Sequence, residues 1–274
     1  MITNPNAGTN VHEIADGLYR INTPVDLPGG QSFSFNQYLL ADDESLLFHT
    51  GPRQIYPLVL EAVGSVMPVA RLRHVAFSHV EADECGALNQ WLAAALRATP
   101  LCGTVAAMVS INDLADRPPR ALADGEVVSL GQHRVRWFDA PHVPHGWECG
   151  FLMEEHTATL LCGDLLTQPG NGQQALTDQD VLGVSEAFRQ QMDYYAHGPC
   201  WKDWRRPTPE RWRACTAARG AAMARECCVR WPRSWRVSCW PYRRWARCRA
   251  GLPLSLHRRT GRFQPMRRAG LAAA

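Results

Sequence analysis

The strongest constraint on how this chain folds is an abrupt change of composition near residue 199. Residues 1–199 contain 10 arginines, no lysine and 23 acidic residues, which gives a net charge of −13. Residues 200–274 contain 18 arginines, one lysine and three acidic residues, which gives +16. The whole-chain value of +3 describes neither segment, so it is no argument for nucleic-acid or membrane binding. We therefore expect one domain over residues 1–199 and consider residues 200–274 separately.

The segment 200–274 has the pattern of no familiar fold. It holds six of the ten cysteines and seven of the ten tryptophans, but no isoleucine and only two valines. Without an apolar period, this composition predicts neither helices nor strands. Its tryptophans and cysteines are atypical of a disordered tail, although a disordered tail is one alternative. A basic, aromatic segment that binds nucleic acid is another, and we expect no nucleic-acid partner.

The codons of this segment favour a third explanation, a shifted reading frame. Residues 200–204 must be encoded TGY TGG AAR GAY TGG. Starting at the third base of the cysteine codon gives Leu-Glu-(Gly or Arg)-Leu with every codon choice. The same offset over residues 214–224 permits Met-His-Gly-Ser-Ala-Trp-Arg-Gly-Asp-Gly, one allowed choice among several. Because the shifted sequence resembles ordinary protein, we infer a frameshift near residue 199, in the gene or in its sequencing.

The sequence contains no motif that predicts secretion or insertion into a membrane. Residues 1–17 have no positive or apolar region typical of a secretory signal. No apolar run approaches the ~18–20 residues of a membrane helix. The four cysteines of residues 1–199 form no CxxC pair, so neither a zinc ribbon nor a thioredoxin motif is predicted. We expect a cytoplasmic protein with free thiols and no membrane partner.

The apolar pattern of residues 1–199 predicts strands in groups, with helices between them. The expected strands are 12–23, 34–49, 72–78, 101–103, 126–130, 135–139, 149–154 and 157–162. The expected helices are 54–67, 84–99, 105–114 and 185–197. This order is typical of an α/β layered domain.

Metal-ligand residue types follow the strand expected at 72–78. His79, Glu81, Asp83 and Glu84 lie within six residues. Alternation directs the first three to one side if the turn stays extended. A mixed imidazole and carboxylate set suits iron, manganese or zinc. An equally weighted alternative is a solvated acidic loop, in which Asp83 and Glu84 favour the start of the next helix.

Two further strand ends carry the same residue types. The strand expected at 135–139 leads to His142 and His145, which flank Pro144. The strand expected at 157–162 leads to Gly163 and Asp164. Histidines in proline- and glycine-rich loops are often plain surface residues, but three strand ends that each deliver a ligand type favour a metal site.

Together these motifs resemble the diiron branch of the metallo-β-lactamase fold. They are Ser-His-Val-Glu-Ala-Asp at 78–83, the histidine loop, and Cys-Gly-Asp at 162–164. That branch includes flavodiiron proteins and stand-alone oxygen-binding diiron proteins. Hydrolases of the fold carry H-x-H-x-D-H and bind zinc, whereas the diiron branch carries H-x-E-x-D, which makes Glu81 the discriminating residue. The resemblance covers roughly residues 10–199 and implies an αββα sandwich, with a C-terminal segment that lacks a credible fold.

The opening strands also resemble the family. Residues 36–40 and 47–51 match its pattern, although His49 stands where an aspartate is usual. The resemblance implies five metal ligands, with Asp164 bridging two iron ions. The implied ligands are His79, Glu81 and His145 for the first iron, Asp83 for the second, and Asp164 for both.

At three positions the sequence departs from the family pattern or offers two candidate residues. His145 is preferred to His142 because its 19-residue offset to Asp164 resembles the family spacing. Glu84 stands where the family usually has a histidine, which is not a ligand in the diiron branch. The family's last histidine, a ligand of the second iron, is missing, since no histidine lies between residues 198 and 256 and both His197 and His257 are wrongly spaced. The shifted frame restores Met-His-Gly-Ser near residue 215.

The resemblance implies a non-haem diiron protein that binds, senses or reduces O₂ or NO. Two ferrous ions would supply two electrons, and an external electron donor is expected because no Gly-rich phosphate loop indicates a flavin domain. With the last histidine missing, weak or single-metal binding is expected. The competing hypothesis is a zinc-dependent hydrolase of an ester, thioester or lactam, against which Glu81 argues. A metal-poor, non-functional product is a further alternative. Whether the protein is an enzyme stays open, and a homodimer is compatible with the sequence.

Overall fold

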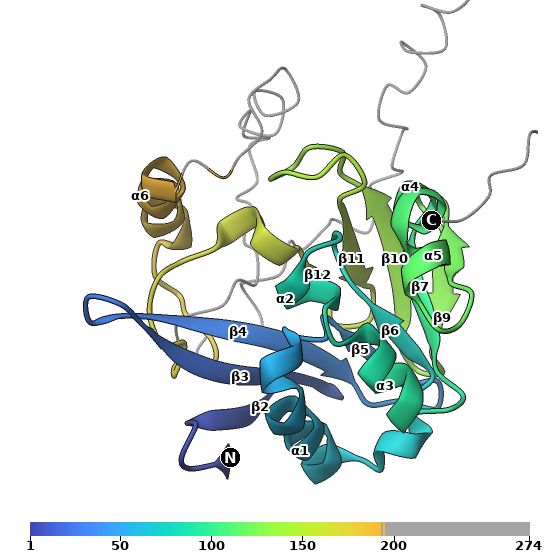
Figure 1. Ribbon diagram of the computed structural model, residues 1–274, viewed down its shortest axis with the longest axis horizontal. Helices are drawn as coiled ribbons and strands as arrows, with labels where there is room; N and C mark the ends of the chain where they lie inside the picture. The colour runs from blue at the N-terminus through green and yellow to red at the C-terminus, as the bar shows by residue number, and fades with distance from the viewer. Residues whose placement is uncertain (193, 195–274) are drawn as a thin grey trace, which may run out of the picture. The chain divides into compact units, whose positions relative to one another are not determined.

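The computed structural model describes residues 1–192 and 194 (Figure 1). The predicted boundary at residue 199, the segment 200–274 and its proposed frameshift lie outside these residues. The strands are β1 (Ile2–Asn4), β2 (Thr9–Ala15), β3 (Leu18–Leu27), β4 (Gln31–Leu40), β5 (Leu46–Phe48), β6 (His74–Ala76), β7 (Thr99–Gly103), β8 (Arg120–Leu122), β9 (Val127–Ser129), β10 (Arg134–Asp139), β11 (Gly150–Glu154) and β12 (Thr159–Leu161).

The helices connect these strands or flank them. They are α1 (Tyr56–Val66), α2 (Ala82–Cys85), α3 (Leu88–Ala94), α4 (Thr104–Ala106), α5 (Asn112–Leu114) and α6 (Val181–Met192). The short 3-10 turns are η1 (Arg53–Ile55), η2 (Val69–Arg71) and η4 (Gly163–Leu166), and η3 (Ala107–Ile111) is a π-helical turn between α4 and α5. None of the described helices is long and apolar enough to cross a membrane.

The larger sheet has eight strands in sequence order, β1 to β8. Neighbouring strands are antiparallel from β1 to β5 and parallel from β5 to β8. Parallel neighbours require crossover connections, and α1, the α2–α3 pair and the α4–α5 segment supply them. The smaller sheet is antiparallel, in the order β12-β11-β10-β9.

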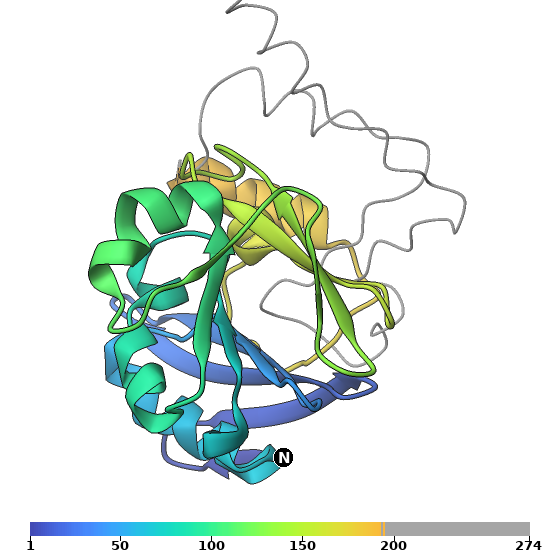
Figure 2. The ribbon, with the colours of Figure 1, turned by 90° about the vertical axis from the view of Figure 1, so that its right-hand side faces the viewer.

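Three apolar clusters stack these elements into four layers. Helices α1 and α3 cover one face of the large sheet through residues at helical spacing, such as Val59 and Val63 on α1. The opposite face meets the small sheet through residues such as Phe48 and Trp137. The far face of the small sheet packs with η4 and Val181 of α6. Figure 2 shows the two sheets face to face. The predicted αββα sandwich is confirmed.

The sequence prediction differs from the structure at several elements. The single strand predicted at 12–23 is a hairpin, because Gly17 adopts a left-handed backbone (φ 62°) between β2 and β3. The helix predicted at 84–99 is two helices, α2 and α3. Strands β1 and β8 were not predicted, because each is short, has at most one buried residue and so shows no apolar pattern. The helix predicted at 185–197 begins earlier, at Val181.

The fold brings three chain segments together at one edge of the sandwich. The loops that follow β6, β10 and β12 are the ones that carry the predicted ligands. Two hydrogen bonds join the loop after β6 to the loop after β10 and to the first residue of β11. Gly150 N donates to Ser78 O at 2.8 Å, and Val80 N donates to Glu148 Oε1 at 3.1 Å. The predicted convergence of strand ends is therefore a property of the structure.

Candidate metal centre

Four of the five predicted ligands form one compact cluster of donor atoms. His79, Glu81, His145 and Asp164 each direct one ligand atom into a group whose members all lie within 4.8 Å of one another. His145 Nε2 lies 3.0 Å from both His79 Nε2 and Glu81 Oε1. Asp164 Oδ2 lies 3.7 Å from His79 Nε2 and 3.8 Å from His145 Nε2. We call this group the imidazole cluster.

The fifth predicted ligand lies in a second group. Asp83 and Glu84 combine with Glu81 in a set of three carboxylates whose ligand atoms again lie within 4.8 Å of one another. We call this group the carboxylate cluster. Glu81 belongs to both groups, so the two clusters adjoin. Glu84 Oε2 lies 3.8 Å from His79 Nε2, which places it beside the imidazole cluster as well.

His79 is oriented by hydrogen bonds from behind. Its side chain is 1% exposed, and its Nδ1 lies 2.8 Å from Ser78 Oγ. Ser78 Oγ in turn lies 3.0 Å from His49 Nε2, so His49, Ser78 and His79 form a buried chain. With Nδ1 engaged, Nε2 of His79 is the nitrogen directed toward the cluster. Such support fixes the ring orientation of a metal-binding histidine.

His49 is buried and has an unusual backbone. Its φ is 67°, in a region that non-glycine residues seldom adopt and that concentrates at functional sites. Burial lowers the pKa of His49 well below its usual value, and the neighbouring His79 adds to the effect. His49 is therefore a neutral partner of Ser78. The sequence singled out His49 only as a departure from the family pattern.

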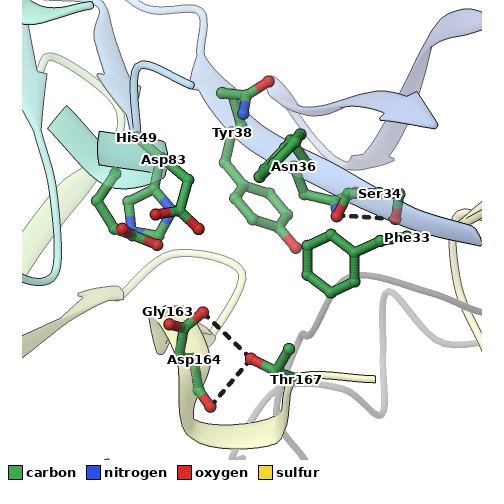
Figure 3. Close-up of a pocket in the computed structure, with 12 residues that line it drawn as sticks. Phe33, Ser34, Asn36, Tyr38, His49, Asp83, Gly163, Asp164 and Thr167 are labelled. Atoms are coloured by element: carbon green, nitrogen blue, oxygen red, sulfur yellow. Dashed lines mark hydrogen bonds between the residues drawn. The ribbon is translucent and has the colours of Figure 1, made fainter. Parts of the chain in front are cut away.

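Asp164 is held by the turn η4 after β12. Thr167 Oγ1 donates to Asp164 Oδ1 at 3.1 Å (Figure 3). The preceding Gly163 has φ 52°, and a Cβ there would lie 2.4 Å from Ser78 Oγ. Glycine is thus required for β12 to end against the loop that carries His79. Thr167, three residues after Asp164, was missed by sequence reasoning.

The structure separates the two rival histidines. His145 is 20% exposed and contributes to the imidazole cluster. His142 is exposed and contributes to no group of candidate ligands among the described residues. The loop between them turns sharply, since His142 N donates to Gly146 O at 2.8 Å. The geometry favours the residue that the 19-residue spacing selects.

The donor set fits a metal cation. Nitrogen and oxygen ligands about 2 Å from a cation lie roughly 3–4 Å from one another, which is the spacing found in the imidazole cluster. The salt bridges of Glu81, Glu84 and Asp164 in the described part of the chain are all with histidines, and no arginine or lysine neutralises them. Two imidazoles and several carboxylates suit iron, manganese or zinc.

The electrostatics of the site reflect this crowding of like charges. Burial raises the pKa of Glu84 well above its usual value, and Asp164 and Asp83 add to the effect. Burial also raises the pKa of Asp164, with His79 opposing it. Glu81 is the opposite case, since its hydrogen bond with His79 lowers its pKa. Burial lowers the pKa of His79, but Glu81 and Asp164 outweigh it, so the net shift is upward.

Comparison with known proteins identifies the family. The model of the family described as "ODP family beta lactamase" matches residues 33–196, which is more than half of the chain and includes every predicted ligand. The chain belongs to this family. Its diiron branch, predicted from Glu81, is supported by relatives that are flavodiiron proteins.

Relatives of known structure share the ODP-family fold at low identity. The rubredoxin-oxygen oxidoreductase of Megalodesulfovibrio gigas is 25% identical over 168 residues, which cover 60% of this chain and 40% of that protein. The structure of rubredoxin oxygen:oxidoreductase from Desulfovibrio gigas superposes with a TM-score of 0.58 at 22% identity, over 68% of this chain and 48% of that one. The structure of the Flv1 flavodiiron core from Synechocystis sp. superposes with a TM-score of 0.55 at 19% identity, again over 68% of this chain and 48% of that one. The chain therefore spans about half the length of these relatives or less.

A small cavity adjoins the two clusters of this ODP-family chain. Its volume is about 50 Å³, and it lies against Asp83, Glu84 and Asp164. Phe33 and Tyr38 of β4 form the opposite wall (Figure 3). The sequence did not indicate these aromatic residues, because strand alternation alone does not tell which face of β4 meets the site.

Proposed function

We propose that this chain is a non-haem diiron protein that binds, senses or reduces O₂ or NO. The proposed ligands are His79, Glu81, Asp83, His145 and Asp164. The observation that carries the proposal is the imidazole cluster, in which Glu81 and three residues from three strand ends converge around one point. Two ferrous ions held there would supply two electrons to the small ligand.

Glu81 supports iron over zinc. Its carboxylate lies 3.0 Å from His145 Nε2 and belongs to both clusters, where the hydrolases of the fold have a histidine. A carboxylate in place of an imidazole is a harder ligand, and harder ligand sets favour iron or manganese over zinc. The cofactor we propose is two iron ions, with zinc as the alternative.

The cavity supports a small ligand. Sites for drug-sized molecules measure about 300–1,000 Å³, whereas the cavity beside Asp83, Glu84 and Asp164 measures about 50 Å³. A diatomic gas fits this space. A larger hollow of about 440 Å³ lies beyond α2, and Glu81 is the one residue of the two clusters that lines it in the described part of the chain. The small cavity beside the two clusters therefore supports O₂ or NO as the ligand.

The protein's own side chains do the positioning. Ser78 holds the His79 ring with Nε2 toward the cluster, and Thr167 holds the Asp164 carboxylate. Phe33 and Tyr38 limit the volume open to the ligand. Turnover would need electrons from outside this domain. The M. gigas relative is named a rubredoxin-oxygen oxidoreductase, and we propose an external electron donor for this chain as well. We also propose a cytoplasmic location.

We further propose that the printed chain is impaired at its second iron. The last histidine expected from the family is missing between residues 198 and 256, outside the described residues. Resequencing the gene around the codons for Pro199 and Cys200 tests the frame directly. One inserted or deleted base supports the frameshift, and a clean frame returns residues 200–274 to the functional candidates.

The function is tested on the full chain loaded with Fe²⁺ under anaerobic conditions. We expect at least one tightly bound iron per chain and an absorption change on adding O₂ or NO. His145→Ala is expected to abolish the change, with His142→Ala as the matched control. A purified chain that holds stoichiometric zinc, ignores O₂ and NO, and cleaves a thioester or lactam would establish the hydrolase instead.

A further inference from the structure

Glu84 is a buried acid that the proposed ligand set does not use. Its side chain is 4% exposed, although it belongs to the four-residue helix α2 beside the loop of metal ligands. Its backbone has a structural role, since Glu84 O accepts from Thr50 N at 2.7 Å. The carboxylate itself faces the candidate metal centre, because it lines the small cavity together with Asp83 and Asp164.

One oxygen of this buried carboxylate has no hydrogen-bond partner among the described residues. That atom is Oε2, which lies 3.8 Å from His79 Nε2. Burying a carboxylate without a hydrogen-bond donor is costly, and the one histidine near it, His79, is shared with Glu81 and Asp164. The nearby groups increase the cost, since Asp83 and Glu81 are acids within the same 4.8 Å group. A cation would resolve both problems, by giving Oε2 a partner and by neutralising the acids.

We propose that Glu84 is a metal ligand and forms, with Asp83 and the shared Glu81, a second cation position made of carboxylates alone. This inference rests on the proposed function, because it concerns the second metal of the same centre. It assigns to Glu84 a role that the family's histidine at this place does not have. It also gives the second cation a donor in a chain that lacks the last histidine.

The chemistry of this position determines what it binds. Oxygen ligands select hard cations such as Mn²⁺ and Fe²⁺, and they bind zinc less well than a set with imidazole does. The imidazole cluster next to it has two histidines. The two positions therefore differ in strength and preference, with the second cation held more weakly. The alternative is a neutral Glu84 that shares a proton with Asp83 and binds no metal.

Titration with Mn²⁺, followed by electron paramagnetic resonance of the free ion, separates these two states of Glu84. The full chain is expected to bind a first and then a weaker second Mn²⁺. Glu84→Gln, which mimics the neutral acid, is expected to keep the first and to weaken the second by at least about tenfold, since even outer-shell changes cost about 10–100-fold in metal affinity. Glu61→Gln, at an exposed position on α1, is the matched control and is expected to bind as the parent does.

Each other result overturns the inference in a recognisable way. Two equivalents with unchanged affinity in Glu84→Gln mean that Glu84 is no ligand, and the proposed diiron function survives. One equivalent in the parent chain means that no second position exists, while the imidazole cluster stands. If the parent chain binds no Mn²⁺ at all, the proposed function is wrong as well. If Glu84→Gln fails to fold, anomalous diffraction from Mn²⁺-loaded parent crystals decides, since the second peak must lie beside Glu84 Oε2.

Discussion

Two buried glutamates of this protein show how a carboxylate of the scaffold differs from one at a site. Glu154, at the end of β11, is fully buried, and its oxygens accept hydrogen bonds from Thr157 N at 2.6 Å, from His156 N at 2.8 Å and from Thr157 Oγ1. His133 Nδ1 lies 3.1 Å from the same carboxylate. Glu84 is nearly as buried, yet its Oε2 has no partner among the described residues.

The contrast teaches where folding and function divide. Glu154 is surrounded by donors, so its burial is compensated by the chain itself. Glu84 lies among acids and shares its one nearby histidine, His79, with two of them, so its burial requires a proton or a cation rather than donors of its own. Polar groups left unsatisfied inside a protein are the ones that require an explanation, and a functional role or a bound ion is one such explanation. The comparison therefore predicts opposite responses from the two residues.

Replacing Glu154 is expected to give the largest effect on stability. Glu154→Ala leaves the donors of the 154–157 turn without an acceptor, which costs about 1–3 kcal/mol for each buried group left unsatisfied. Iron content per folded chain is expected to stay unchanged, because the residue touches neither cluster. Urea denaturation and metal analysis of the same samples check both parts. A stable variant that has lost its iron would reverse the roles we assign.

Replacing His145 is expected to affect metal binding at a similar scale. A structural metal site binds with about 10–16 kcal/mol in total, so the loss of one of four ligands corresponds to about 100- to 1,000-fold in affinity. His142→Ala is expected to leave the affinity unchanged, because His142 is exposed outside the imidazole cluster. Competition titration with a chelator measures both variants. Equal losses in the two would mean that the loop, rather than one ring, determines binding.

The sequence predicted the parts of the site that follow from strand ends and spacing. His79, Glu81 and Asp164 each come directly after an apolar strand, and parallel or paired strand ends converge on one edge of a layered fold. The choice of His145 came from the resemblance, because its offset to Asp164 matches the family spacing. The fold class followed from the same pattern, because groups of strands separated by helices have few layered solutions.

The remaining parts depend on contacts that no local pattern encodes. His49 meets Ser78 across 29 residues of sequence, and its left-handed backbone cannot be foreseen from its residue type. The direction of Glu84 depends on the break between α2 and α3 near Gly86, where an added Cβ would lie 2.3 Å from Ala82 O. The pattern instead predicted one continuous helix at 84–99, in which Glu84 would be a solvated residue of the first turn.

Removing the hydroxyl behind His79 is expected to give a moderate loss of metal affinity. Ser78→Ala frees Nδ1 of His79 from its 2.8 Å contact and breaks the chain to His49. Groups that hydrogen-bond the far nitrogen of a metal-binding histidine are worth about 10–100-fold in metal affinity. Ser78→Thr keeps the hydroxyl and is the comparison variant. Co²⁺ absorption spectra report the ring geometry, and a band unchanged in Ser78→Ala would show that the hydroxyl is dispensable.

The pH dependence of the metal-free protein distinguishes Glu84 from ordinary carboxylates. Because its folded pKa is raised well above 4.5, the native state keeps a proton that the unfolded state has lost. Stability is therefore expected to fall as the pH rises from 4.5 toward the folded pKa, by up to about 1.4 kcal/mol per pH unit. Glu84→Gln is expected to flatten this slope in chelator-treated protein. An unchanged slope would mean that Glu84 is ionised without metal.

Asp42 is expected to show the opposite sign and the smallest effect. Burial raises its pKa, but the hydrogen bonds from His133 N and Asp43 N, both 2.7 Å long, outweigh burial and lower the pKa below 3.8. Its contribution is therefore present above pH 3.8 and lost as the pH falls through the lowered value. Asp42→Asn is expected to reduce the acid sensitivity slightly, since a solvent-screened carboxylate contributes little. Chemical denaturation at pH 2.5–5 measures it. Asp42 and Glu84 titrate in different pH windows and change stability with opposite signs. The double variant is therefore expected to show the sum of the two changes in unfolding free energy. A non-additive result would mean that the two carboxylates are energetically coupled.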